Sequence, residues 1–287
     1  MKIYKRRPHW LKVKLPGGKN FSVVNDIVQD EKLFTVCQSA RCPNQGECWG
    51  RRTATFMILG NTCTRNCRFC AVDTGKPDAV DPDEPRRLAN AVKALELRYA
   101  VITSVTRDDL PDGGAGQFAS VLYAVREKQP ECALEVLIPD FKGNVDALRT
   151  VLDAGPDVLN HNVETVPRLY PQVRPQANYR QSLTVLRNAA EMGAVTKSGM
   201  MVGLGETLDE IKQVMQDLLD HQCRILTIGQ YLQPSADYLP IDRFVTPDEF
   251  SEYKTIGMAM GFDHIESGPL VRSSYHADEQ YADSRAV

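Results

Sequence analysis

The chain has 287 residues, a length typical of a single α/β-barrel domain and sufficient for a large buried core. It contains 34 lysines and arginines against 37 aspartates and glutamates, so no overall positive charge favours nucleic-acid binding. No stretch approaches the roughly 18 consecutive apolar residues of a membrane helix, and the N-terminus lacks the apolar region of a signal peptide. We therefore expect a cytoplasmic protein that binds neither nucleic acid nor membrane.

From residue 1 to about residue 30 the chain is basic and contains prolines and glycines, which predicts an extended arm rather than a strongly periodic helix. Its basic residues are Lys2, Lys5, Arg6, Arg7, Lys12, Lys14 and Lys19. Such an arm is either a solvated surface segment or a docking site for an acidic partner.

Six of the eight cysteines form two compact triplets. Disulfide frameworks belong mainly to short secreted chains, so this clustering favours metal binding in a reducing compartment. The other two, Cys132 and Cys223, are expected to be small buried hydrophobic residues.

The first triplet has four and then five residues between its cysteines, which are Cys37, Cys42 and Cys48. Pro43 and Gly46 favour a loop here, and a loop allows three thiolates to converge on one centre. Thiolates bind both zinc and iron–sulfur clusters. A zinc site completed by a remote histidine, such as His9 or His276, is therefore an alternative that the spacing leaves open.

The second triplet lies within eight residues, directly after an apolar run at 53–60, and consists of Cys63, Cys67 and Cys70. A zinc ion normally takes four protein ligands, often in paired C-x2-C units. Three thiolates on one short loop can instead hold three irons of a cubane cluster and leave the fourth iron open to a small molecule. A structural metal site completed by a distant fourth ligand is the alternative.

The spacing of the second triplet, with Phe69 before its last cysteine, resembles the signature of the radical S-adenosylmethionine (SAM) superfamily. The resemblance implies a [4Fe–4S] cluster whose free iron binds SAM. It also implies that an electron from the cluster cleaves SAM and produces a 5′-deoxyadenosyl radical.

From Thr53 onward, apolar runs alternate with amphipathic segments, which is typical of βαβ units and a parallel sheet. The predicted strands are 53–60, 99–104, 133–139, 157–160, 196–204 and 225–231. The predicted helices are 84–97, 117–129, 144–154, 179–192, 208–221 and 247–260. Six repeats predict an α/β fold with a closed or three-quarter barrel, and the radical SAM resemblance implies the partial (β/α)6 form of a TIM-type barrel. Its chemistry is expected on loops at the C-terminal strand ends.

Several loop residues are candidates for binding. Asn162 and Glu164 follow the fourth strand, where they would contact SAM or form a buried hydrogen-bonded network. Arg174 offers a bidentate fork for a carboxylate, although a surface salt bridge explains it as well. The segment 112–116, Asp-Gly-Gly-Ala-Gly, opens a helix and is either an anion cradle or a plain turn.

The segment Gly203-Leu204-Gly205 ends the fifth predicted strand. It is not a dinucleotide fingerprint, because Leu208 stands where the third glycine would be. It resembles the glycine-rich fifth-strand segment of radical SAM proteins, where adenine lies close to the backbone. The resemblance implies cofactor contacts at Gly203 and Gly205.

The two triplets, the barrel pattern and the terminal segment Arg-Ser-Ser-Tyr at 272–275 together resemble the lipoyl synthase family over nearly the whole chain. The resemblance implies that Ser274 completes an auxiliary [4Fe–4S] cluster on the first triplet, while the second triplet holds the SAM-binding [4Fe–4S] cluster. Ser274 is the expected catalytic residue, since an oxygen ligand suits iron–sulfur centres less well than thiolate and should release readily.

The same resemblance implies the reaction and its partners. Radical chemistry would insert two sulfur atoms, at C6 and C8 of a protein-bound octanoyl-lysine, and the auxiliary cluster would be sacrificed as their source. The implied substrates are octanoylated lipoyl-carrier domains, namely E2 subunits of 2-oxoacid dehydrogenases and the glycine cleavage H protein. Ferredoxin or flavodoxin would be the reductant.

We expect three regions: an N-terminal extension with the first triplet (1–52), the barrel (53–262), and a C-terminal extension (263–287) that adds no further repeat. Both extensions are expected over the barrel mouth. Two other interpretations remain: a different radical SAM sulfur-inserting enzyme, biotin-synthase-like or a methylthiotransferase, or a non-catalytic iron–sulfur electron carrier. A carrier would need no six-unit barrel, and its clusters would normally be fully ligated by protein.

Overall fold

The computed structural model describes residues 6–13 and 16–284. An eight-stranded sheet organises it, in the order β1-β2-β5-β6-β7-β8-β9-β10. Its strands are β1 (Phe34–Thr35), β2 (Thr55–Ile58), β5 (Tyr99–Ser104), β6 (Ala133–Leu137), β7 (Val158–Asn160), β8 (Thr196–Val202), β9 (Ile225–Gln230) and β10 (His264–Gly268). All neighbours from β2 to β10 pair in parallel, while β1 pairs antiparallel with β2.

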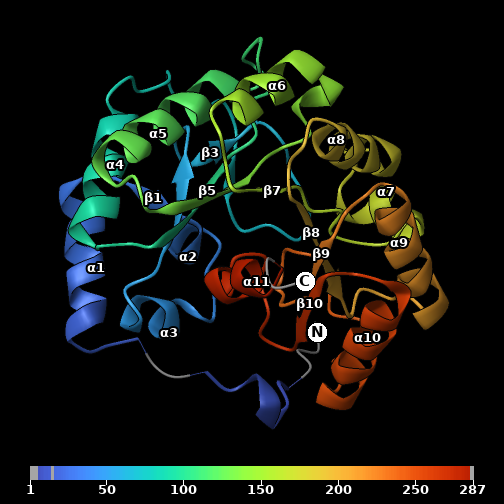
Figure 1. The fold of residues 1–287 in the computed structure, drawn as a ribbon. Coiled ribbons are helices and arrows are strands. Elements are labelled where there is room, and N and C mark those ends of the chain that lie inside the picture. The colour runs from blue at the N-terminus through green and yellow to red at the C-terminus, as the bar shows by residue number, and fades with distance from the viewer. Residues whose placement is uncertain (1–5, 14–15, 285–287) are drawn as a thin grey trace.

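Helices cover the outer side of the curved sheet (Figure 1). They are α4 (Glu84–Ala94), α5 (Ala115–Lys128), α6 (Val145–Asp153), α8 (Tyr179–Glu191), α9 (Leu208–Asp220) and α10 (Pro247–Met260). Capping boxes of Thr207 with Glu210 and Thr246 with Glu249 begin α9 and α10, and Gly261 ends α10 in the left-handed conformation, at φ 110°. The predicted partial barrel is therefore confirmed, and the ends of its elements lie within three residues of the predicted ends.

Strands β2 and β5 are buried on both faces, which explains their nearly continuous apolar sequences. Phe56, Ile102 and Val136 are fully buried in one apolar cluster between the strands and helices α4 to α6. A second cluster joins β8 and β9 to α8, α9 and α10 through residues such as Leu186 and Ile228. These two clusters hold the loops at the strand ends in place.

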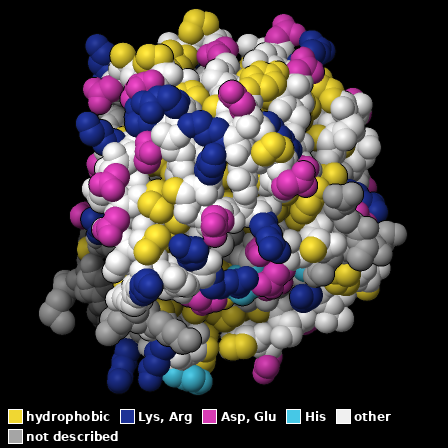
Figure 2. Space-filling model, turned by 60° about the vertical axis from the view of Figure 1, so that its left-hand side comes forward, with side chains coloured by type: hydrophobic (Ala, Val, Ile, Leu, Met, Phe, Trp, Pro, Cys, Tyr) yellow, Lys and Arg dark blue, Asp and Glu magenta, His cyan; other side chains and the backbone are white. Residues whose placement is uncertain are grey.

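Smaller elements complete the chain. They are η1 (His9–Leu11), α1 (Lys19–Asp30), α2 (Val36–Ser39), α3 (Gln45–Gly50), β3 (Thr62–Cys63), β4 (Asp73–Thr74), η2 (Phe141–Gly143), η3 (Pro167–Leu169), α7 (Tyr170–Val173) and α11 (Ala277–Ser284). None of the helices in the described ranges is long and apolar enough to cross a membrane. Basic and acidic side chains are interspersed over the face shown in Figure 2, in line with the near balance of charge.

The prediction of an extended N-terminal arm up to about residue 30 is wrong for its second half, because residues 19–30 form α1. Val24 and Val28, four residues apart, lie on one buried face of this helix, and the Phe21 ring packs 5.0 Å from that of Trp49. Residues 19–30 contain one lysine and two aspartates, so the basic part of the arm ends where this helix begins. Lys2, Lys5 and Lys14 lie outside the described residues.

The prediction that no repeat follows residue 262 is also wrong. Strand β10 follows α10 and pairs in parallel with β9, so the sheet extends beyond the predicted barrel boundary. Its sequence, His-Ile-Glu-Ser-Gly, contains one large apolar residue, Ile265, and therefore lacks the apolar run of the other strands. Pairing with β9 decides its conformation.

The two extensions meet at the open side of the sheet. The Asn44 amide donates to the Leu270 carbonyl at 2.7 Å, and the Tyr275 hydroxyl donates to Glu47 at 2.9 Å. The Tyr281 ring of α11 lies 5.6 Å from that of Tyr99, the first residue of β5. The contacts between the extensions therefore run along the open side of the sheet, from the start of β5 to the residues that follow the C-terminal end of β10.

Candidate active site

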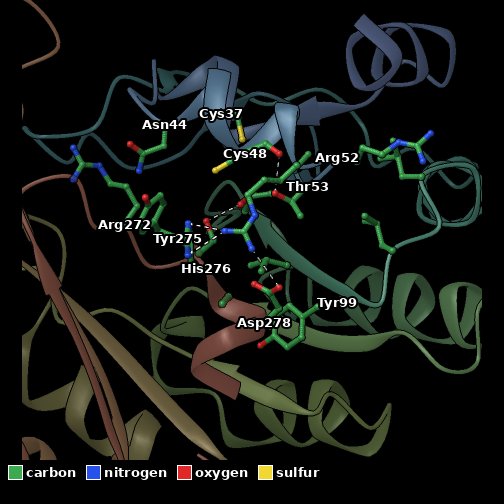
Figure 3. Close-up of a pocket in the computed structure, with 18 of the residues that line it drawn as sticks. Cys37, Asn44, Cys48, Arg52, Thr53, Tyr99, Arg272, Tyr275, His276 and Asp278 are labelled. Carbon is green, nitrogen blue, oxygen red and sulfur yellow. Dashed lines mark hydrogen bonds and ion pairs between the residues drawn. The ribbon is translucent and has the colours of Figure 1, made fainter. Parts of the chain in front are cut away.

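The first triplet and Ser274 line one cavity of about 290 Å³ at the starts of β2 and β5. Cys37 comes from α2, Cys48 from α3, and Cys42 from the turn between these helices. Figure 3 shows the Cys37 and Cys48 sulfur atoms pointing toward the segment that carries Tyr275 and His276. The structure therefore brings both ends of the chain to one place.

Short helices and backbone hydrogen bonds hold these cysteines. The Thr35 hydroxyl caps α2 by accepting a hydrogen bond from the Gln38 N–H. The Cys48 carbonyl accepts from both the backbone N–H and the hydroxyl of Thr53, at 2.9 and 3.0 Å. The strand that begins at Thr55 is thus tied directly to the triplet.

The electrostatics of this cavity oppose free thiolates. Burial, together with repulsion from neighbouring thiolates, raises the pKa of Cys37 to about 11 and that of Cys48 to about 12. Burial also raises the pKa of Cys42, although the positive charge of Arg272 opposes it. Three such thiols can ionise together only with compensating positive charge, so this donor set fits an iron–sulfur cluster.

The two consecutive serines of the terminal segment are held from different sides. The Thr55 hydroxyl donates to Ser274 Oγ at 2.7 Å, beside the first triplet. The Asn162 amide donates to Ser273 Oγ at 2.7 Å. Since Asn162 follows β7, this segment connects the first cavity to the loops at the C-terminal strand ends.

His276, one histidine considered for a zinc site, is engaged elsewhere. Its ring nitrogens lie 2.8 and 3.1 Å from Arg51 Nη1, with further contacts to Glu47 at 3.2 Å and Glu279 at 3.1 Å. Its ring also lies 4.1 Å from that of Tyr275. Within the described ranges, no three Cys, His, Asp or Glu side chains are grouped closely enough to hold a single metal ion.

The second triplet lies at the opposite end of β2. The Cys63 thiol accepts hydrogen bonds from the backbone N–H groups of Arg65 and Thr106, at 3.4 and 3.3 Å. Cys67 and Cys70 line a second cavity, of about 220 Å³. The predicted position of this triplet, after the first barrel strand, is therefore the observed one.

A buried arginine fixes the loop of the second triplet. The Arg65 guanidinium, 6 % exposed, forms paired hydrogen bonds with Asp108 and with Asp140, each with a shortest distance of 2.7 Å. Burial opposes ionisation of Asp140, but the Arg65 hydrogen bonds and charge prevail and lower its pKa to about 2. Sequence analysis did not identify this network, because its members are remote in the chain.

Arg174 lies beside the second triplet rather than in a surface ion pair. Burial raises the pKa of Cys67, and the charge of Arg174 and its hydrogen bond to the thiol oppose this rise. One Arg174 Nη atom donates to the Asn162 carbonyl at 3.0 Å, and the guanidinium carbon lies 5.5 Å from the centre of the Tyr170 ring. Burial also raises the pKa of Cys70 to about 12.

Glu164 and Asn162 belong to the same polar group as Arg174. Glu164 has φ 67°, which is uncommon for a residue with a side chain and frequent at functional sites. Burial raises the pKa of its carboxyl, which accepts from the Asn162 amide at 3.1 Å. Asn162 Oδ1 and Arg174 Nε are buried and have no hydrogen-bond partner among the described residues. Buried groups of this kind suit a polar ligand such as SAM.

The backbone groups of Gly203 and Gly205, which follow β8, form hydrogen bonds with neighbouring protein side chains. The Gly203 and Leu204 N–H groups donate to the Glu206 carboxylate, at 2.5 and 2.9 Å. A side chain at Gly203, where φ is 93°, would collide with the Gln230 amide and the Arg243 carbonyl. The Gly205 carbonyl accepts from Arg168 at 2.8 Å. Packing thus explains Gly203, and cofactor contacts at both glycines remain a prediction.

The glycine-rich turn at 112–116 is not an open anion site. The Asp112 carboxylate itself accepts from the Gly114 and Gly116 N–H groups, at 2.9 and 2.8 Å. The two remaining cysteines, Cys132 and Cys223, are fully buried free thiols, as predicted.

Comparisons with known proteins identify the family of the chain. Residues 57–218 match the family model of the radical SAM superfamily, and residues 2–42 match that of the N-terminal domain of lipoyl synthase. A lipoyl synthase from Rubrobacter xylanophilus is 60 % identical over 281 residues, which is 97 % of this chain and 88 % of that protein.

Two solved structures share the fold alone. Streptococcus suis SuiB bound to its precursor peptide SuiA has a TM-score of 0.60 at 10 % identity, over 74 % of this chain and 48 % of that one. This chain thus spans about half the length of SuiB. Methylornithine synthase has a TM-score of 0.53 at 13 % identity, over 88 % of this chain and 84 % of that one. The two family models and the 60 % identical relative show that the chain belongs to the lipoyl synthase family of radical SAM enzymes, whose cofactors are SAM and [4Fe–4S] clusters.

Proposed function

We propose that the two triplets hold separate [4Fe–4S] clusters, and that the chain inserts sulfur at C6 and C8 of a protein-bound octanoyl-lysine. Cys63, Cys67 and Cys70 would hold the SAM-binding cluster. The auxiliary cluster, which would be the sulfur source, would have four ligands, Cys37, Cys42, Cys48 and Ser274. The observation that carries the proposal is Ser274, which lines the cavity of the first triplet from the far end of the chain.

When bound, SAM and the clusters supply the radical chemistry and the sulfur that unactivated carbon atoms require. The residues of the chain bind, orient and exclude water. Arg174 would bind the carboxylate of SAM, with Glu164 and Asn162 beside it, because all three lie together next to Cys67. Gly203 and Gly205 are the weaker candidates for cofactor contact, since the Gly203 N–H is already bonded to Glu206.

Ser274 would act as a ligand that releases readily, since an oxygen ligand is harder and less suited to iron–sulfur centres than thiolate. Replacing it by a stronger ligand should therefore stop sulfur transfer. We expect Ser274→Cys to retain its iron but to form little lipoyl product. Normal product formation by this variant would contradict the assigned role.

The decisive experiment is anaerobic reconstitution, followed by counting iron and sulfide. The protein is then incubated with SAM, a reductant and an octanoylated peptide. We expect about eight irons per chain, 5′-deoxyadenosine, and a product containing two new sulfur atoms. A single cluster would refute the auxiliary site, and a product of different mass would favour another sulfur-inserting enzyme.

Lipoyl-carrier proteins are the substrate class that membership of the family implies. The proposed carriers are E2 subunits of 2-oxoacid dehydrogenases and the glycine cleavage H protein, with ferredoxin or flavodoxin as reductant. The eight free cysteines support a reducing, cytoplasmic location.

The N-terminal residues would contribute to carrier binding. Arg6 and Arg7 are exposed, whereas Lys5 lies outside the described residues. Reversing the charge of all three should raise KM for an acidic carrier protein and leave KM for a short octanoyl-lysine peptide unchanged. Equal effects on both substrates would exclude docking.

A further inference from the structure

Thr55 occupies an unusual position between two parts of the first cavity. It is the first residue of β2, 7 % exposed, and it lines the cavity with the cysteines. Its hydroxyl donates to Ser274 Oγ at 2.7 Å, and 219 residues separate the two in the chain. Its backbone N–H also donates a hydrogen bond to the Cys37 thiol. Thr55 therefore touches two of the four proposed ligands.

The position of Thr55 is rigid. β2 is paired with β1 on one side and β5 on the other, with Thr55 opposite Val101 in the β5 register. The hydroxyl is thus presented from a fixed backbone, whereas Ser274 lies in a segment without helix or strand between β10 and α11. A fixed donor can orient a side chain on a less regular segment.

A serine oxygen that binds iron must lose its proton, and a buried oxygen that carries negative charge needs a hydrogen-bond donor. We infer that Thr55 is a positioning residue for Ser274: its hydroxyl donates a hydrogen bond to the serine oxygen and directs that oxygen toward the auxiliary cluster. This inference rests on the proposed function, because it requires a cluster at the first triplet.

Binding of Ser274 to iron would require only that its hydroxyl proton be exchanged with solvent. If Ser274 bound an iron of the cluster, its hydroxyl proton would pass to solvent through the cavity, whose lining includes the exposed carboxylate of Glu96. On release from the iron, the serine oxygen would take up a proton from solvent by the same route. A hydroxyl both donates and accepts, so Thr55 can remain hydrogen-bonded to Ser274 in both states.

Other contacts keep the terminal segment in place through this exchange. The Asn162 amide holds Ser273, and the Asn44 amide holds the Leu270 carbonyl. The serine oxygen can therefore leave the iron by rotation of its own side chain, while the backbone stays in place. Thr55 then decides how readily the oxygen returns.

The test uses the full chain, reconstituted anaerobically, before any SAM is added. Thr55→Val removes the hydroxyl and keeps the shape of the side chain. We expect this variant to release its first iron to a ferrous chelator about tenfold faster than the parent. We also expect it to show a larger paramagnetic resonance signal from a three-iron cluster. Thr55→Ser, which keeps the hydroxyl, should restore both properties to the values of the parent.

Thr103→Val is the matched control. Thr103 is 6 % exposed on the neighbouring strand β5, and its hydroxyl donates to the Leu137 carbonyl at 2.8 Å, away from the triplet. This variant should release iron at the rate of the parent. If Thr55→Val does not fold, Thr55→Ala removes the same hydroxyl and is measured in its place.

The outcomes separate the inference from the proposed function. If the parent holds about eight irons and removal of the Thr55 hydroxyl leaves iron release and the three-iron signal unchanged, the inference is wrong and the auxiliary cluster stands. Equal effects of Thr55→Val and Thr103→Val would also overturn it. If the parent holds only about four irons, and Cys42→Ala does not reduce that number, the proposed function itself fails.

Discussion

The two cysteine triplets lie at opposite ends of the same strand and are built in different ways. The second triplet is local, since all three thiols lie within eight residues of the chain. The buried Arg65 side chain fixes this segment through Asp108 and Asp140. The cavity of the first triplet is lined from both ends of the chain, because Ser274 joins the three cysteines there. The hydrogen bond between Thr55 and Ser274 connects the two parts. A cluster that is retained through many turnovers would be held well by ligands from one short segment. A cluster that is sacrificed would suit a ligand from a remote segment that releases readily.

Removing one cysteine from each triplet should have the largest effect and separate their roles. Cys70→Ala should lose about four irons and form no 5′-deoxyadenosine, because the SAM-binding cluster needs all three thiolates. Cys42→Ala should lose a similar amount of iron, still cleave SAM, and insert no sulfur. Iron counts and product chromatography measure both variants. Loss of SAM cleavage in both would show that the two sites are not independent.

Replacing Arg65, which holds the loop of the second triplet, should have the next largest effect, a loss in the free energy of unfolding. Arg65→Ala leaves the Asp140 carboxylate, 1 % exposed, without its partner. Breaking a buried pair in this way typically costs about 3–5 kcal/mol in the free energy of unfolding. Urea unfolding of the cluster-free protein measures it. A cost below about 1 kcal/mol, which is usual for surface pairs, would show that the network does not hold the loop.

Lowering the pH should destabilise the fold through His161, a buried imidazole after β7. Burial, assisted by the charge of Arg174, lowers the pKa of this imidazole from 6.5 to about 4, and the neutral ring bonds to the Ile138 carbonyl and the Ser182 hydroxyl. Because the folded pKa is depressed, stability is lost as the pH falls from 6.5 to about 4, by about 3 kcal/mol.

The check is urea unfolding at several pH values within that window. His161→Gln cannot titrate, so the slope of its unfolding free energy against pH should be smaller than that of the parent. Subtracting the slope of the variant from that of the parent removes the contribution of the carboxylates, because both proteins contain the same carboxylates. Identical slopes would mean that His161 does not take up a proton in this range.

The smallest effect is expected at the outer rim of the first triplet. Arg51 contacts Glu279 at 2.8 Å, and its side chain is 39 % exposed. Solvent-exposed pairs contribute at most about 1 kcal/mol, so Arg51→Ala should lower the free energy of unfolding by no more than that. Urea unfolding beside Arg65→Ala provides a direct comparison. A loss as large as that of Arg65→Ala would show that the first site is as firmly supported as the second.

Much of this molecule was predictable from its sequence. Apolar runs alternating with amphipathic segments predicted the βαβ units, since buried parallel strands need apolar residues on both faces. The tight spacing of the second triplet predicted its place after the first barrel strand, because neighbours in sequence on a short loop must be neighbours in space.

Only the tertiary structure decided the rest. Strand β10 has one large apolar residue and becomes a strand because β9 offers a parallel edge. The contacts of Ser274 with Thr55, and of Arg65 with Asp140, join residues far apart in the chain, which no local pattern encodes. Local preferences act over a few residues, whereas these contacts depend on where the sheet brings its two edges and its loops. That arrangement exists only once the whole core has packed.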